Sequence, residues 1–265
     1  MWFVCSGAAQ EPSSEKPLPE MSTLWQAIKP HLMDQYDQAE ILKGYTYRRD
    51  HVEEELDRND AVRKTEHSEY QVFYVDQGAF SKLVRKDGVP ISDKEAKKQD
   101  EEFEKFKRSG PEHRRSAKER EENLDDVYNG ANLQVLRREL VAGRPTIVVS
   151  FTPRPDAKLA GRPSKYIVPN VEGTAWVDEQ DFRLVRLNVR FLRSVKIGFG
   201  LLANIGEGGE LTVLWSKVNN EVWLPAHVDG HLKGRVLVKG FNTHVVEDFS
   251  DYKKFVVETT IKVNE

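Results

Sequence analysis

Three strands separated by tight polar turns can be traced directly in residues 173–225. Successive side chains of a strand point to opposite faces, so strict alternation of polar and apolar residues predicts a strand with one solvent-exposed face and one apolar face. Within the middle strand, the alternation assigns one face to Leu184, Arg186, Asn188 and Arg190 and the other to Val185, Leu187, Val189 and Phe191. The segment is therefore typical of an antiparallel sheet that buries one face.

Further hairpins precede this segment. Strands are predicted from Tyr45 to Leu56 and from Val62 to Val75, and the turn between them, residues 57–60, is too short for a crossover. More strands follow in residues 79–85, 133–141 and 146–153, without any regular alternation of strands and helices. The expected fold class is mainly β (α+β), built on a single antiparallel sheet.

Two helical regions interrupt the strands. Apolar residues near helical spacing predict a helix over 23–42, with Ser22 as its N-cap and a bend at Pro30. Ser92 and Glu95 form a capping-box pattern that opens a strongly charged helical insert, residues 92–128. A second charged helix is expected over 111–128, and helices with so few apolar residues lie on a surface rather than in a core.

Composition limits the function classes. The charged fraction is 31%, the hydrophobic fraction is 38% and the mean hydropathy is −0.62, but much of the charge is concentrated in residues 92–126. The remainder has the composition of one globular domain, expected over 21–265. A net charge of −3 disfavours nucleic-acid binding, which needs a clustered basic surface.

The N-terminus resembles a secretory leader. Residues 1–10 are short and apolar and end in small residues, and a flexible Pro/Ser/Glu-rich stretch follows, so residues 1–20 are interpreted as a truncated signal and leader. The single cysteine, Cys5, excludes a disulfide framework, and its lipidation is an open alternative to removal with the signal. No stretch reaches the ~20 apolar residues of a membrane span.

The order of elements resembles the lipoprotein-carrier superfamily of the bacterial envelope, the Lol-type carriers and their lipid-binding relatives. The resemblance rests on the amphipathic N-terminal helix that leads to Tyr45 and on three strand segments, residues 173–178, 182–187 and 221–225. It implies an open, curved half-barrel with helices as a lid over an apolar concave face. It also implies a non-enzymatic role, without a cofactor, in the periplasm.

Large apolar side chains on the predicted strands suggest a cavity for an acyl chain. The candidate lining residues are Phe73, Trp176, Leu187, Phe199, Leu201, Val213 and Trp215. The candidate lid residues are Leu24, Ile28, Phe103 and Phe106. The alternative is an ordinary core in which the N-terminal helix and the curvature of the sheet fill this face.

Motifs for catalysis or metal binding are weak. Ser150 is in a strand rather than in a nucleophile elbow, and Asp178 and Asp181 are in a turn, where aspartate is favoured for backbone hydrogen bonding. His227 and His231, four apart on a strand, lie about 13 Å from one another, which is too far to share a metal. His51 and His67 could face each other across the first hairpin, but a solvated face is the simpler interpretation, so no metal or catalytic site is predicted.

Two functions remain. The first is a monomeric periplasmic carrier or sensor that binds a lipid or the acyl group of a lipoprotein. The second is an envelope protein–protein interaction module with a self-filled core, in which the charged helical arm docks a protein partner. A hydrolase is a weaker third hypothesis.

Overall fold

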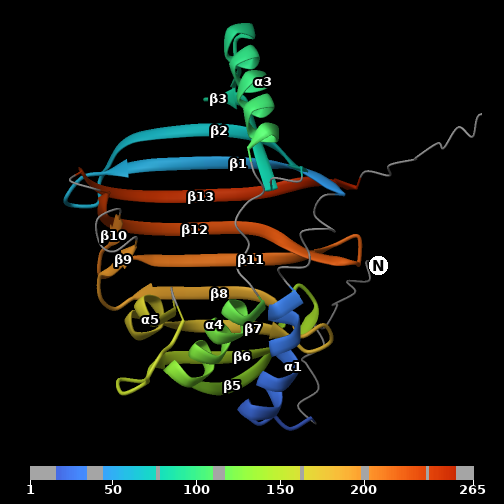
Figure 1. Cartoon of the computed structure of the whole chain (residues 1–265), viewed down its shortest axis with the longest axis vertical. Coiled ribbons are helices and arrows are strands. Elements are labelled where there is room, and N and C mark those ends of the chain that lie inside the picture. Colours follow the sequence, from blue (N-terminus) through green and yellow to red (C-terminus); the bar gives the residue numbers. More distant parts are fainter. Residues whose placement is uncertain are drawn as a thin grey trace, which may run out of the picture.

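The computed structural model describes residues 16–34, 44–75, 78–109, 117–161, 164–197, 203–236 and 239–254. Within these ranges, thirteen strands form one sheet in the order β4-β3-β2-β1-β13-β12-β11-β8-β7-β6-β5, and the short β9 and β10 extend from β12 (Figure 1). Every strand pair is antiparallel and the sheet does not close, which confirms the predicted fold class. The strands are β1 Tyr45–Leu56, β2 Val62–Val75, β3 Gly78–Lys86, β4 Val89–Pro90, β5 Ala131–Val141, β6 Arg144–Pro153, β7 Val171–Asp178, β8 Leu184–Phe191, β9 Val195–Ile197, β10 Ala203–Ile205, β11 Glu210–Val218, β12 Val222–Val236 and β13 Lys239–Lys254.

The last described strand lies inside the sheet. β13 pairs with β12 on one side and with β1 on the other, so Asp50 of β1 is opposite Asp248 of β13. Two hairpin meanders, β1–β4 and β5–β12, are thus joined through β13. The local turn pattern of the sequence does not specify this long-range pairing.

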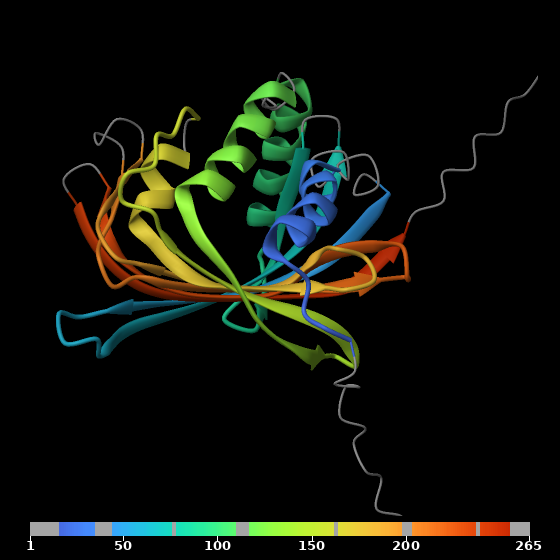
Figure 2. The ribbon, with the colours of Figure 1, turned by 90° about the horizontal axis from the view of Figure 1, so that it is seen from below.

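The helices lie mainly on one side of a strongly twisted and curved sheet (Figure 2). Helices α1 Met21–Asp34, α4 Ala117–Gly130 and the short α5 Ser164–Ile167 cross in front of β5–β8 (Figure 1). A 3₁₀ turn, η1 Val168–Asn170, follows α5. We call the face under α1 the helix side and the opposite face the outer side.

Helix α1 begins at Met21, before the predicted start at residue 23, so Ser22 lies in its first turn and is not the N-cap. Pro30 lies in its interior. Leu24 and Ile28, one turn apart, bury their side chains against Ile147, Val149 and Val177 of β6 and β7. The second half of the predicted helix, residues 35–43, is outside the described residues.

Helix α3 Asp93–Arg108 begins at the predicted capping box. The Ser92 hydroxyl accepts a hydrogen bond from the Glu95 backbone N–H, and the Glu95 carboxylate accepts one from the Ser92 N–H at 3.0 Å. Helix α3 has no buried residue, which confirms that it is a surface helix. Of the second predicted helix, residues 111–116 are outside the described residues and the remainder belongs to α4.

The predicted alternation in β8 is wrong at its start. Val177 pairs with Leu184 and Trp176 with Arg186, so Val185 is an extra residue in a β-bulge. Leu184 therefore packs with the α1 cluster on the helix side, and Val185 packs with Val148 and Trp176 on the outer side. Beyond the bulge, the alternation from Arg186 to Phe191 follows the prediction.

Candidate ligand-binding face

The helix side of the central strands carries an aliphatic surface that no described helix covers. Register links Leu187 to Val213 and Val213 to Val228, and in the neighbouring row it links Val189 to Leu211. All of these side chains are only half-buried. We define the apolar patch as Leu187, Val189, Leu211, Val213, Val228 and Val245.

A polar group borders the patch where β13 meets β1. Val228 pairs with Glu247, and Glu247 pairs with His51. Glu247 Oε1 is 3.0 Å from His51 Nδ1 and 3.5 Å from Arg49 Nη1, and the Arg49 guanidinium lies 4.5 Å from the centre of the Tyr70 ring. The helix side thus changes from aliphatic to charged within one strand spacing.

Aromatic side chains follow on the same face. Tyr47 is close to Tyr252 at 4.9 Å between ring centres, and also to Tyr74 and Phe249. Burial raises the pKa of the Tyr47 phenol far above its ordinary value and raises the pKa of Tyr252 as well. This end of the face is therefore lined by aromatic rings, and the Tyr252 hydroxyl donates to the Pro225 carbonyl oxygen.

The other end of the face is covered by α1, which is fixed at two places. Lys29 Nζ is 2.7 Å from Asp125 Oδ1 of α4, a contact that raises the pKa of Lys29, and Trp25 stacks on Tyr128 at 5.0 Å. At the opposite end of the helix, the Arg183 guanidinium donates to the His31 carbonyl oxygen. Helix α1 is therefore attached both to α4 and to the turn between β7 and β8.

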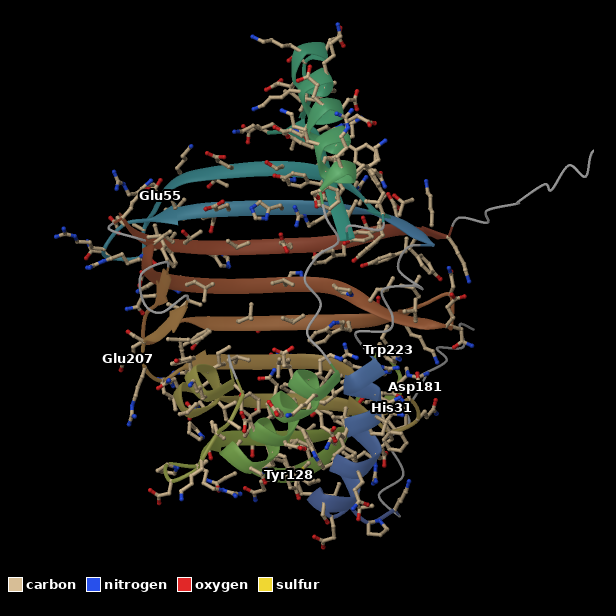
Figure 3. The ribbon with its side chains drawn as sticks, in the orientation of Figure 1. His31, Glu55, Tyr128, Asp181, Glu207 and Trp223 are labelled. Atoms are coloured by element: carbon tan, nitrogen blue, oxygen red, sulfur yellow. The ribbon has the colours of Figure 1, made fainter. Side chains whose placement is uncertain are left out.

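That turn contains a buried ion-pair cluster. Asp178 is fully buried and accepts two hydrogen bonds from Arg144, at 2.5 and 2.9 Å, and further ones from the backbone N–H groups of Gln180 and Asp181. Figure 3 shows Asp181 and Trp223 at the same end of α1 as His31, and Trp223 Nε1 donates to Asp181 Oδ2 at 2.9 Å. These contacts confirm the backbone-bonding role predicted for Asp178. The prediction is wrong for Asp181, whose carboxylate contacts the side chains of Arg144, Trp223 and Lys217 instead.

Asp181 has a lowered pKa although burial opposes its ionisation. Hydrogen bonds from Lys217 and from Trp223 outweigh the cost of burial. The charged side chains of this cluster are paired with side chains of opposite charge, so we interpret the cluster as a structural one. The sequence predicted the turn but not Arg144, Lys217 and Trp223, which come from other hairpins.

The structure separates the predicted cavity residues. Leu187 and Val213 belong to the apolar patch. Trp215 comes after a register shift between Leu214 and Trp215, pairs with Pro225 and is half-buried. Trp176 packs on the outer side against Val148, where its Nε1 donates to Glu139. Phe199 and Leu201 lie outside the described residues.

Phe73 also faces the outer side. His51, which is on the helix side, pairs with Ser68 of β2, so Ser68 is on the helix side as well. Alternation along β2 then places Tyr70 and Val72 on the same side. Phe73 therefore points the other way, where its ring contacts Phe80 at 5.6 Å and Phe103 of α3 at 4.9 Å. It is close to α3 rather than to the patch.

The four predicted lid residues form two separate groups. Leu24 and Ile28 of α1 cover β6 and β7 on the helix side, and Phe103 and Phe106 of α3 contact Phe80 on the outer side. The aromatic residues of α3 are its anchors to the sheet, as expected from their isolation in a charged helix. Helices α1 and α3 thus pack on opposite faces.

The histidines are divided by the same alternation. His51 pairs with Ser68 and His67 pairs with Val52, so the two lie on opposite faces and do not face each other as considered from the sequence. On the outer side, His244 Nδ1 lies 2.9 Å from Glu54 and its Nε2 lies 3.2 Å from Asp229. The hydrogen bond with Glu54, with Asp229 in support, raises the pKa of His244.

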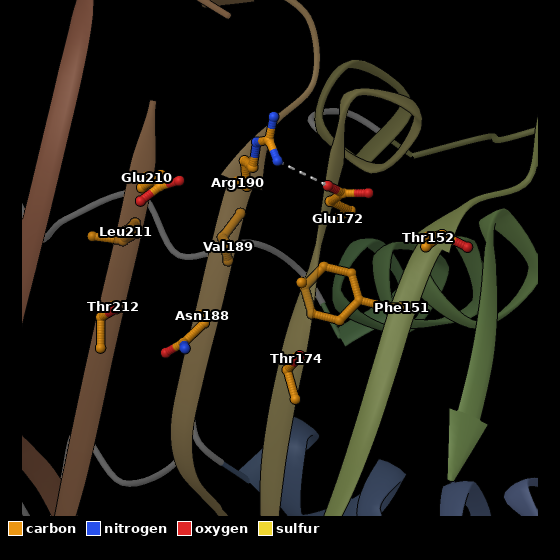
Figure 4. A pocket seen from close by; sticks show the side chains of 11 residues that line it. Phe151, Thr152, Glu172, Thr174, Asn188, Val189, Arg190, Glu210, Leu211 and Thr212 are labelled. Carbon is orange, nitrogen blue, oxygen red and sulfur yellow. Dashed lines mark ion pairs between the residues drawn. The ribbon is translucent and has the colours of Figure 1, made fainter. Parts of the chain in front are cut away.

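The outer side is polar over the middle strands and has a shallow hollow of about 370 Å³ (Figure 4). Thr174, Asn188 and Thr212 line it, and an ion pair of 3.8 Å between Arg190 and Glu172 closes one end. Polar and charged side chains dominate the lining of this hollow, which makes it a poor surface for an acyl chain. The apolar patch is the better candidate site.

No described helix is long and apolar enough to cross a membrane.

Comparison with known proteins gives likenesses of structure. No protein-family model matches the sequence, and no curated protein matches it. A LolA superfamily protein from Nitrosomonas europaea aligns over 86% of this chain and 94% of its own at 11% identity, with a TM-score of 0.35. A putative outer membrane lipoprotein-sorting protein domain from Vibrio parahaemolyticus aligns over 85% and 93% at 10% identity, also with a TM-score of 0.35.

A third similar structure is MucB in complex with the periplasmic part of MucA. It aligns over 86% of this chain and 99% of its own at 10% identity, with a TM-score of 0.23. We base the fold of the present chain on its own strand registers and base its function on the faces described above.

Proposed function

We propose that this protein is a non-enzymatic carrier or sensor that binds the acyl chain of a lipid or lipoprotein on its apolar patch. The observation that supports this is a continuous set of six half-buried aliphatic side chains in the middle of the sheet, next to the end covered by α1. Exposed apolar areas of this kind on a protein surface commonly mark binding sites.

The chemistry of the patch favours an acyl chain over a polar ligand. Each methylene moved from water to an apolar surface contributes about 0.8 kcal/mol, so even partial cover of a long chain supplies several kcal/mol. Arg49, His51 and Glu247 limit the patch on one side and leave the polar end of a ligand close to charged groups. The resemblance drawn from the sequence points to the same ligand class.

The location and domain organisation belong to the same proposal. We propose that residues 1–20 are a secretory signal and leader segment, that residues 21–265 form one lipoprotein-carrier-like unit, and that the protein acts as a monomer in the periplasm. We further propose, from the sequence alone, that Trp215, Phe199 and Leu201 contribute to ligand binding.

Ligand binding can be tested by native mass spectrometry and organic extraction of protein that has been secreted to a bacterial periplasm. We expect a co-purifying acylated species, or a mass shift when a diacylated lipopeptide is added. A clean mass that does not change with the lipopeptide would contradict the proposal.

Two neighbouring residues of β13 provide a matched pair. Val245 belongs to the patch, and Val246 pairs with Val52 on the outer side, although both are half-buried. We expect Val245→Asp to weaken binding of a fluorescent fatty acid at least about tenfold, which corresponds to roughly 1.4 kcal/mol. Val246→Asp should leave it within about twofold, and equal losses in both variants would argue against the patch.

A second candidate function uses α3 as a docking arm for an envelope protein. Helix α3 has a complete N-terminal cap, no buried residue and a charged exposed surface that includes Lys94, Lys97 and Lys98. Pull-down of periplasmic proteins with wild type and a Lys97→Glu/Lys98→Glu variant tests it. Loss of a captured protein in the variant, with unchanged fatty-acid binding, would favour this function over the first.

A further inference from the structure

Three carboxylates lie side by side on the outer side of the central strands. Asp50 of β1 is directly opposite Asp248 of β13 and directly opposite Glu69 of β2. Like charges placed opposite one another destabilise a sheet unless a cation compensates them. Basic side chains lie next to each member of this row, Arg48 beside Asp50, Arg85 beside Glu69 and His227 beside Asp248.

An imidazole lies next to this row. His67 is two residues from Glu69 on β2 and so shares its face, and its Nε2 lies 3.7 Å from Asp50 Oδ1. One ligand atom each of Asp50, His67 and Glu69 lies within 4.8 Å of the other two. The ligands of a tetrahedral zinc ion are about 3.4 Å apart, given metal–ligand distances near 2.1 Å, so small side-chain rotations would bring these atoms to that spacing.

The surrounding charges leave the inner oxygen of Asp50 available. Arg48 Nε bonds the other oxygen of Asp50 at 3.2 Å, and Arg85 Nε lies 3.9 Å from Glu69 Oε2. Asp248 is held by His227 at 2.7 Å and so is outside the ligand group. Carboxylates that ligate metals are themselves commonly oriented by hydrogen bonds from a second layer of residues, and Arg48 is placed for that role.

We propose that Asp50, His67 and Glu69 form a binding site for a divalent metal ion of the zinc class. One imidazole and two carboxylates are a donor set that suits Zn²⁺, whereas Ca²⁺ and Mg²⁺ prefer oxygen ligands alone. The three side chains are partly buried, with 26%, 40% and 16% of their surface exposed, so the ion would be reachable from solvent and complete its coordination with water. The ion would connect β1 to β2, the strand whose Phe73 packs against α3.

Isothermal titration of ZnCl₂ into the untagged, chelator-treated full chain tests this site. A Cys5→Ser background removes the only thiol from the measurement. We expect one equivalent of Zn²⁺ to bind with a Kd below about 100 μM, and the same protein to bind Ca²⁺ at least tenfold more weakly. The absence of saturable Zn²⁺ binding up to 1 mM would overturn the proposal.

Variants distinguish this site from the other outer-side histidines. His67→Gln and Glu69→Gln should each weaken Zn²⁺ binding at least tenfold, with urea midpoints of the metal-free proteins reported alongside to show that both are folded. His227→Gln is the matched control, since it lies on the same face beside the row but outside the ligand group, and it should change the Kd less than twofold. Equal affinity in wild type and His67→Gln, or a loss confined to His227→Gln, would overturn the assignment.

Discussion

Two strands of the same sheet, β6 and β13, differ sharply in burial. Four consecutive residues of β6, Thr146 to Val149, are buried, so this strand is covered on both faces. No residue of β13 is buried, although β13 lies in the middle of the sheet with a strand on each side. A central position in the sheet therefore does not determine burial.

The difference comes from the side chains that pack against each face of the strand. On the helix side, α1 covers Ile147 and Val149, and on the outer side Val148 packs against Trp176 and Val185. Among the described residues, no helix packs over β13, which has one half-buried valine on each face, Val245 and Val246, and charged pairs on the outer side. The part of the sheet without a second layer is the part where a ligand could supply one.

The largest effect should follow from a cavity in the covered strand. Ile147 is fully buried against Leu24 and Ile28, so Ile147→Ala removes buried methyl groups where the structure cannot easily collapse. We expect a loss of about 3 kcal/mol in the free energy of unfolding, measured by urea denaturation. A loss below about 1 kcal/mol would mean that α1 does not seal this face.

Much of the fold follows from local sequence signals. Short polar turns predicted antiparallel hairpins, and Ser92 with Glu95 predicted the start of α3, because both signals act through backbone hydrogen bonds between near neighbours. The bulge at Val185 was missed. Leu184 was an apolar residue on an otherwise polar face, but the extra residue is identified by the register with Trp176 and Val177. The same limit explains why the pairing of β13 with β1 could not be predicted.

The candidate site was predicted less completely than the fold. Leu187 and Val213 follow from strand alternation, but Trp176 and Phe73 were placed by size and hydrophobicity, which do not tell one apolar face from another. Their outer-side positions depend on the packing partners Val148 and Phe103, which come from distant elements. The proximity of Asp50 to Glu69 and His67 likewise depends on the register of the first hairpin.

Shortening a side chain of β13, the strand that no described helix covers, should lower the free energy of unfolding much less. Val245 pairs with Gly230 on β12 and is only half-buried, so Val245→Ala removes apolar area that is already partly in water. We expect about 1 kcal/mol or less in the same urea assay. A cost equal to that of Ile147→Ala would show that a layer covers β13 after all, and the contrast between the two strands would disappear.

The charged pairs on the outer side of β13 should make the stability of the protein depend on pH. Glu54 and Asp229 raise the pKa of His244 above its ordinary value, so folding favours the protonated imidazole. The stabilisation is therefore fully present below the unfolded pKa near 6.5 and is lost as the pH rises through the folded value. We expect the urea midpoint of wild type to exceed that of His244→Gln more at pH 5.5 than at pH 8.5. A difference that grows with pH would contradict this sign.

The smallest effect concerns the attachment of the covering helix. Lys29 of α1 is paired with Asp125 and Glu121 of α4, with 28% of the lysine side chain and about half or more of each carboxylate exposed. Solvent screens such pairs, so Lys29→Ala should cost about 0.5 kcal/mol and less in 1 M salt. Lys118→Ala, which removes a pair with Glu122 within α4, should cost no more than that. If Lys29→Ala instead approached the cost of Ile147→Ala, the burial of β6 would depend on the ion pair that holds α1 to α4 rather than on the apolar contacts of Leu24 and Ile28.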